Sequence, residues 1–227
     1  MRLSVIIPTW NEEANIADAI TSAWTGGADE VVVVDGGSSD ATVQRASNTD
    51  AAVLASQPGR GPQQNAGAAY AVGDMLLFLH ADCRLQEGAK AAIKESKQTA
   101  GCFYQSIAIH HPLRKLLQEG NAFRAWRGRP YGDQAIWVSR ERFEAAGGFP
   151  DWPLMEEVEL CRRLRLGWNT RVLLHPLVIV SPRRWEASGV IRQTLLNAFI
   201  LNAWRCGVGP HRLAKWYDTL RRKDGSC

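Results

Sequence analysis

The chain has 227 residues, 45% of them hydrophobic, and a formal net charge of +4 at pH 7, which suits one large α/β domain. Its five cysteines are scattered and contain no CxxC pair, which argues against a disulfide framework or a zinc knuckle and favours a reducing, cytoplasmic setting. No apolar run reaches the ~18 residues of a membrane span, and Pro8 breaks the N-terminal run too early for a signal peptide.

Charge is distributed unevenly along the chain. Residues 1–100 carry 7 Lys/Arg and 12 Asp/Glu, whereas the remainder carries 20 and 11. The basic residues of the second half are dispersed rather than gathered in blocks, so we expect no nucleic-acid partner. An anionic small molecule or a membrane surface accounts for them equally well.

Strand-like apolar runs alternate with segments of helical period in the first hundred residues. We expect strands at 3–8, 30–35, 51–56 and within the run 73–85, and helices at 12–24 with Asn11 as cap, 41–47 and 63–73. Such alternation is typical of a mostly parallel sheet flanked by helices. Beyond residue 100 we expect strands at 102–110 and 133–138, helices at 112–126 and 155–167, and a helical, basic final segment.

The first four expected strands all end in polar segments: PTWNEE, DGGSSD, QPGRGPQQNAG and HADC. In open α/β sheets, ligands bind beyond the carboxyl ends of the strands. His80 and Asp82 are therefore expected beside a ligand.

Neither GxGxxG nor GxxxxGK[ST] is present, so a bound nucleotide needs another source of positive charge, and a divalent metal held by hard oxygen ligands is the usual one. Asp82 is a candidate oxygen ligand, although capping of the following turn explains it equally well. A lone histidine such as His80 is more often a satisfied core residue than a ligand.

Two further segments carry candidate chemistry. Glu156 and Glu157 lie at the start of an expected helix. The helix N-terminus stabilises a carboxylate as an anion, so one of the two could act as a general base. Acidic residues are also common in first turns, and this is the simpler explanation. Arg183 and Arg184, followed by Trp185, have the composition of a phosphate clamp beside a sugar-stacking ring, or of a solvated basic patch.

Taken together and in this order, the segments resemble the family 2 glycosyltransferases, which have the GT-A nucleotide-diphospho-sugar transferase fold. The resemblance covers roughly residues 3–185. SVIIPTWNEEANI is similar to the family's first strand and loop, VVVVDGGSSDAT to its nucleoside loop, and GRGPQQNAGAAYAVGDMLLFLHADCRL to the run into its DXD metal motif. GGFPDWPLMEEVELCRRLRLG is similar to the acceptor segment with the ED motif, and RRW to the RW of the QxxRW motif. GDQAI, DWPLMEEVEL and FLHAD look like the radical-SAM/selenodomain-associated branch that is linked to arsenosugar biosynthesis.

The resemblance implies one GT-A domain over residues 1–227, with a nucleotide-binding half (1–100), an acceptor half (101–185) and C-terminal basic helices (186–227). It also implies a metal, Mg2+ or Mn2+, on Asp82, with His80 standing where the motif has its first Asp. The implied nucleotide-binding residues are Pro8, Thr9, Glu12, Asp35, Arg60 and Asn65. Gly36 replaces the second Asp of the nucleoside loop, and Gln64 replaces the Arg of the family's Arg-Asn pair, so Arg60 is expected to supply the missing charge.

The implied reaction is an inverting transfer of a hexosyl-type sugar from a nucleotide-diphosphate donor, a UDP-sugar, to a hydroxyl of a small-molecule or lipid acceptor. Glu157, at the Asp position of the ED motif, is the expected base. Glu156 is expected to hold hydroxyls and Arg184 to stabilise the leaving diphosphate. Expected acceptor-side residues are Asp133, Gln134, Trp152 and Trp185.

Two other functions remain open from the sequence. A sugar-phosphate nucleotidyltransferase needs a Gly-rich basic loop after the first strand, and PTWNEE is not one. A nucleotide-sugar-binding subunit without catalysis is suggested by the substitutions at His80 and Gly36. The last segment carries 9 Lys/Arg and 3 Asp/Glu from residue 181 onward. Two roles are open for it: peripheral contact with the inner face of a membrane, or packing or dimerisation.

Overall fold

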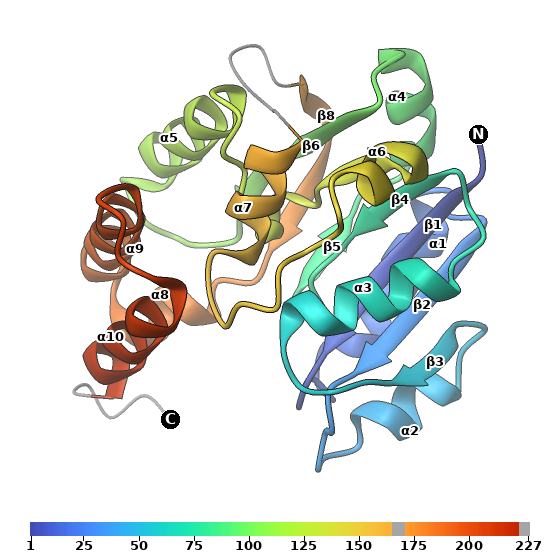
Figure 1. Ribbon diagram of the computed structural model, residues 1–227, viewed down its shortest axis with the longest axis horizontal. Helices are drawn as coiled ribbons and strands as arrows, with labels where there is room; N and C mark the ends of the chain where they lie inside the picture. Colours follow the sequence, from blue (N-terminus) through green and yellow to red (C-terminus); the bar gives the residue numbers. More distant parts are fainter. Residues whose placement is uncertain (165–170, 223–227) are drawn as a thin grey trace.

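The computed structural model describes residues 1–164 and 171–222, in which one sheet lies between two layers of helices (Figure 1). The strands are β1 (Leu3–Thr9), β2 (Glu30–Asp35), β3 (Ala52–Ala55), β4 (Met75–Phe78), β5 (Cys83–Leu85), β6 (Ala100–Ile107), β7 (Trp137–Ser139) and β8 (Arg171–Val180). Their order in the sheet is β3-β2-β1-β4-β7-β6-β8-β5. The helices are α1 (Ile16–Thr25), α2 (Thr42–Ser47), α3 (Arg60–Tyr70), α4 (Ala89–Ser96), α5 (Arg114–Trp126), the 3-10 turn η1 (Gly132–Gln134), α6 (Arg140–Ala145), α7 (Glu156–Arg163), α8 (Arg183–Ser188), α9 (Val190–Arg205) and α10 (Pro210–Arg222).

Both faces of the sheet are buried, which explains why the central strands are apolar throughout. In β1, Val5 and Ile7 point into the core that α1 and α4 cover, whereas Ile6 points into the core beneath α3, α6 and α7. This alternation follows from the two-residue period of a strand.

The nucleotide-binding half expected from the sequence has the expected topology. β1 pairs in parallel with β2 and β4, and β2 with β3, so the carboxyl ends of these strands lie along one edge. β7 enters antiparallel between β4 and β6. The prediction of an α/β fold with a mostly parallel sheet flanked by helices is confirmed.

The apolar run 73–85 does not form one strand. β4 ends at Phe78, and a turn in which the Cys83 N–H donates to the His80 carbonyl oxygen (3.0 Å) separates it from β5. β5 pairs with β8 at the far edge of the sheet. β8 is a strand that the sequence pattern did not indicate, because Pro176 interrupts its apolar run.

Two expected helix starts are wrong. α1 begins at Ile16 rather than residue 12, because Asn11 has a positive φ of 52° and its side chain accepts from the Ser39 N–H (2.8 Å) instead of capping the helix. α3 begins at Arg60, three residues before the expected start. α7 ends at Arg163, and the rest of the expected helix at 155–167 lies largely outside the described residues.

The C-terminal helices pack beside the acceptor half. α9 and α10 contact each other and cover Met155 and Val158 of the α7 segment. Within residues 1–164 and 171–222, no helix has both the length and the apolar character that a bilayer crossing requires.

Candidate active site

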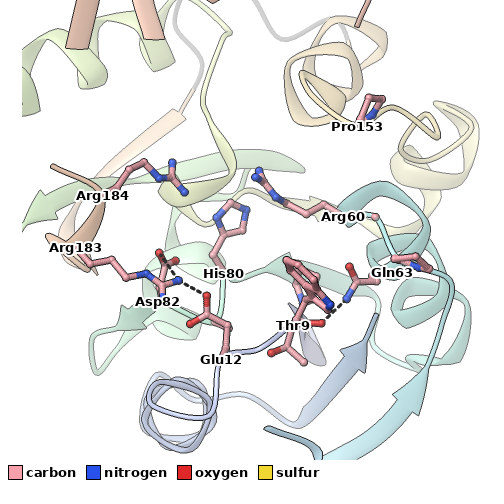
Figure 2. Close-up of a pocket in the computed structure, with 14 residues that line it drawn as sticks. Thr9, Glu12, Arg60, Gln63, His80, Asp82, Pro153, Arg183 and Arg184 are labelled. Carbon is pink, nitrogen blue, oxygen red and sulfur yellow. Dashed lines mark hydrogen bonds and ion pairs between the residues drawn. The ribbon is translucent and has the colours of Figure 1, made fainter. Parts of the chain in front are cut away.

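A cavity of about 510 Å3 opens at the carboxyl ends of β1 and β4. Its lining residues are Pro8, Thr9, Trp10, Glu12, Pro58, Gly59, Arg60, Gln63, His80, Ala81, Asp82, Pro153, Arg183 and Arg184. Figure 2 shows that these residues come from segments far apart in the chain. The cavity lies where the polar ends of the expected strands indicated a ligand site.

Three arginines make the cavity suitable for an anion. Arg60 begins α3, and Arg183 and Arg184 begin α8. Arg183 pairs with Glu12 and lies 3.6 Å from the Asp82 carboxylate, whereas Arg60 and Arg184 flank His80 in Figure 2. Guanidinium groups in this arrangement suit the oxygens of a phosphate or diphosphate.

Asp82 and His80 both face the cavity and fit a divalent cation as partial ligands. Burial opposes ionisation of Asp82, but the neighbouring His80, Arg184 and Arg183 outweigh it and lower the pKa of Asp82. His80 Nε2 is buried and makes no hydrogen bond, although Glu157 Oε1 lies 3.3 Å from it. Within the described residues, no three His, Cys, Asp or Glu side chains form a metal-binding group. The pair therefore suits a Mg2+ or Mn2+ ion whose other ligands are substrate oxygens and water.

Glu156 and Glu157 lie at the first turn of α7, and both are nearly fully buried. The Arg60 Nη1 atom is 3.5 Å from Oε1 of each, and Glu157 Oε1 is 3.3 Å from His80 Nε2. Met155, with a φ of 69°, turns the chain into the helix and directs the two carboxylates inward.

The two glutamates have opposite protonation tendencies. Burial and the charge of Glu157 raise the pKa of Glu156. Burial also opposes ionisation of Glu157, but the contact with His80 and the charge of Arg60 outweigh it and lower the pKa. At neutral pH the pair therefore holds an ionised Glu157 beside a protonated Glu156, as a general base and a neighbouring hydroxyl donor require.

A second, smaller cavity of about 90 Å3 adjoins Glu157 and shares Arg60, His80 and Arg184 with the large one. Asp133, Tyr131 and Gly132 of the η1 segment form one wall. The Oδ1 atom of Asp133 is buried without a hydrogen-bond partner, and burial raises the pKa of this carboxyl. Glu157, the shared side chains Arg60, His80 and Arg184, and the unpartnered Oδ1 atom of Asp133 thus meet at this small cavity.

The structure brings most of the predicted site residues together. Pro8, Thr9, Glu12, Arg60, His80, Asp82 and Arg184 line the large cavity, and Glu157 and Asp133 line the small one. Glu156 is buried behind Glu157 and lines neither.

Other predicted residues support the cavities without lining them. The Asp35 carboxylate accepts from the Gly37 and Ser38 N–H groups of its own loop (2.9 Å each). Asn65 bonds both backbone polar groups of Phe149 (2.9 Å each). Their direct contact with a nucleotide stays a prediction.

Three of the four predicted acceptor residues lie away from the small cavity. Gln134 is fully buried, and its Oε1 accepts from Arg124 (3.2 Å) and from the Tyr131 N–H (3.3 Å). Trp185 packs into the core beneath α8, and Trp152 lines none of the cavities. Trp185 also lines a third cavity, which lies between α5 and α9. A sugar-stacking role for either tryptophan stays a prediction.

The sequence analysis missed Gln63, which is buried and donates to the carbonyl oxygens of Thr9 and Val34 (2.7 Å each). Gln63 also explains Gly36, because a Cβ on Gly36 would lie 3.1 Å from the Gln63 side chain. The sequence signal for Gln63 was Gly36, which stands where the family's nucleoside loop has a second Asp. A glycine at that position indicates that another side chain occupies the space.

Comparisons with known proteins agree with this geometry. Residues 4–130 match the family model described as "Glycosyl transferase family 2". No curated protein matches the chain.

Several solved structures share the fold. The chain is 22% identical to S. aureus TarS with a TM-score of 0.64, covering 80% of this chain and 37% of TarS. It is 21% identical to the mannosyltransferase PcManGT from Pyrobaculum calidifontis in complex with GDP-Man and Mn2+, with a TM-score of 0.60, covering 98% and 73%. Glucosyl-3-phosphoglycerate synthase from Mycobacterium tuberculosis is 20% identical with a TM-score of 0.60, covering 92% and 81%. The chain thus spans well under two thirds of TarS and most of the other two.

Proposed function

The chain belongs to glycosyl transferase family 2, and from this premise we propose that it transfers a hexosyl-type sugar from a nucleotide-diphosphate donor to an acceptor hydroxyl with inversion. The observation that carries the proposal is the arginine-lined cavity, which adjoins through Arg60, His80 and Arg184 the small cavity that Glu157 lines. Complexes of structurally similar proteins with UDP-GlcNAc and with GDP-Man support a nucleotide-sugar donor. We take UDP as the nucleotide carrier because the first loops are similar to those that hold uridine in the family.

In this mechanism the donor lies in the large cavity and the acceptor in the small one. Glu157 removes the proton of the acceptor hydroxyl, whose oxygen forms a bond to the anomeric carbon as the bond to the diphosphate oxygen breaks. Arg184 and Arg60 stabilise the negative charge that builds on the leaving diphosphate. Glu156, which is buried behind Glu157 and lines neither cavity, supports Glu157 from that side, and the hydroxyl-holding role expected from the sequence is not favoured by this placement.

Asp82, with His80, would hold a Mg2+ or Mn2+ ion that supplies further positive charge to the diphosphate when bound. The Mn2+ complex of PcManGT is in keeping with this proposal.

The proposal extends to the organisation of the domain, with donor binding in residues 1–100, acceptor binding in 101–185 and a helical extension in 186–227. It also extends to membership of the radical-SAM-associated branch.

A two-step experiment tests the proposal. Thermal unfolding is measured with UDP, UDP-sugars and GDP-mannose, with and without Mn2+, since a ligand that binds the folded state raises its stability. The donor found in this way is then used to measure sugar hydrolysis and transfer across an acceptor panel. We expect Glu157→Gln to lower turnover by about 100-fold or more while the nucleotide-induced stabilisation persists.

Glu159→Gln is the matched control, because Glu159 lies on the same helix but pairs with Arg162 and Arg163 and lines none of the three cavities. Binding without turnover in the wild-type chain would instead identify a nucleotide-sugar-binding subunit. Equal losses in the two variants would show that Glu157 is not the base.

A further inference from the structure

Exposed large apolar side chains of the second half gather on two helices, α5 and α9. They are Leu113, Leu116, Phe123 and Trp126 in the α5 segment, and Ile191, Leu195 and Phe199 on α9. Leu116 and Leu195 are 69% and 66% exposed, so these side chains gain little from packing in the free protein. Apolar surface gathered in this way marks an interaction site more often than scattered exposed leucines do.

The exposed apolar residues of α9 form a stripe that lies outside the packed core. Ile191, Leu195 and Phe199 are spaced four residues apart and therefore share one side of the helix. A different side of α9, with Leu196 and Ile200, packs with α10 and the segment before α7. The helix is thus apolar on a packed side and on an open side.

The two helices adjoin each other. A cavity of about 400 Å3 lies between them, with Leu116 and Leu117 on the α5 side and Ala198 and Leu201 on the α9 side. Figure 1 shows α5 and α9 together at one end of the molecule, away from β1, β2 and β3. The exposed α9 residues Ile191, Leu195 and Phe199 lie outside this cavity. We name the exposed surfaces of the two helices, taken together, the α5–α9 face.

Cations surround this surface. Exposed Lys/Arg residues on α5, α9, α10 and their flanks are Arg114, Lys115, Arg127, Arg192, Arg205, Arg212 and Lys215, whereas the exposed acids there are Glu119 and Asp218. Arg127 lies over the Phe123 ring (5.9 Å), and Arg212 over the Trp216 ring (6.0 Å), which itself stacks on Phe199 (5.9 Å). Aromatic rings beside cations are typical of surfaces that rest at the headgroup level of a bilayer.

We propose that the α5–α9 face docks the protein onto an anionic lipid bilayer. Its positive charge complements anionic headgroups, and its exposed leucines and phenylalanines provide the apolar insertion that charge attraction alone lacks. A nucleic acid would not use aliphatic side chains such as Leu195 and Ile191. The surface extends the contact expected from the sequence for the C-terminal helices, because α5 contributes to it.

The test is co-sedimentation of the full chain with vesicles. Phosphatidylcholine vesicles are compared with vesicles containing phosphatidylglycerol, at low and high salt, and free glycerol phosphate serves as a competitor. We expect binding to the anionic vesicles at low salt, loss of binding at high salt and on the neutral vesicles, and no displacement by glycerol phosphate.

Variants locate the contact. Leu116→Gln and Leu195→Gln are each expected to weaken vesicle binding by about fivefold or more, because each removes one inserted aliphatic side chain. Leu174→Gln is the matched control, since Leu174 is 61% exposed but lies on β8, and its binding should stay within about twofold of the wild type. Circular dichroism checks that all three variants are folded.

Three results would overturn the proposal: no sedimentation with anionic vesicles at low salt, equal binding by all three variants, or release by glycerol phosphate. Light scattering provides a fourth. If the wild type is dimeric and Leu195→Gln is monomeric, the face is a contact between two copies of this chain. Nucleotide binding is measured in parallel on the same protein. A failure of vesicle binding therefore does not affect the proposed sugar transfer, which the nucleotide measurement tests separately.

Discussion

Gly132 lies against two side chains that line the small cavity. A Cβ at this position would lie 2.3 Å from Glu157 Oε1 and 2.4 Å from His80 Nε2, closer than any nonbonded contact allows. The absence of a side chain here is therefore what lets the carboxylate and the imidazole approach each other.

Gly132→Ala is expected to displace Glu157, lowering turnover by at least tenfold, and to cost about 1–3 kcal/mol of stability through overpacking. Turnover and urea unfolding measure the two effects. Gly120→Ala is the control, because Gly120 lies on α5 with nothing within 4 Å of the added Cβ. That variant should be as stable as the wild type or slightly more so. Unchanged turnover in Gly132→Ala would mean that the Glu157 position is not critical.

At the residue scale, the sequence indicated the groups that stand in recognisable motifs. Asp82, Arg60 and Glu157 were named from the resemblance to the family's motifs, because residue type alone left turn capping and helix-start chemistry as equal or simpler explanations. Gln63 escaped notice because a glutamine in a small-residue helix has no such signature, and its role depends on carbonyl groups from two strands. A sugar-stacking role for Trp185 stays a prediction, because an indole suits a core as well as a sugar.

At the element scale, α3 connects the parallel strands of the first hundred residues to the segment that leads to α7. Asn65 on this helix bonds the N–H and the carbonyl oxygen of Phe149 (2.9 Å each), and Phe149 is buried against Phe78. The loop that precedes Glu156 and Glu157 is thus fastened to the helix that begins with Arg60.

Asn65→Ala is expected to lower the free energy of unfolding by about 2 kcal/mol or more, because two buried backbone groups lose their partners. Chemical denaturation measures the change. Gln44→Ala, an exposed amide truncation on α2, should alter stability by less than about 0.5 kcal/mol. A change in Asn65→Ala no greater than in the control would contradict a fastening role.

Most element types in the first hundred residues were predictable because apolar runs and helical periods there are regular, but β5 and α4 were not predicted. Boundaries were less so: α3 starts at Arg60 through Gly59, whose φ of 127° only the folded backbone reveals. β8 escaped because Pro176 breaks its pattern, yet its partners β5 and β6 supply enough pairing to hold it in the sheet.

At the scale of the whole molecule, the buried glutamate pair links stability to pH. The pKa of Glu156 is raised by burial and by Glu157, so the folded state retains a proton that the unfolded chain releases above its ordinary value of 4.5. The stabilisation is fully present below that value and is lost as pH rises through the raised pKa of the folded state.

The free energy of unfolding of the wild type is therefore expected to fall by up to about 1.4 kcal/mol per pH unit, relative to Glu156→Gln, as pH rises from about 5 toward 8. Urea denaturation of both proteins at matched pH values measures this difference, in which other titrating groups cancel. A difference that is constant with pH would show that Glu156 is not protonated in the folded protein.

The arrangement of the three cavities also bears on where an acceptor extends. The large cavity and the cavity between α5 and α9 have no lining residue in common, and each meets the small pocket beside Glu157 through a different set of side chains. Under the proposed transfer, an acceptor seated beside Glu157 would extend toward the cavity between α5 and α9 through Tyr131, Asp133 and Asn197, on the side away from the donor.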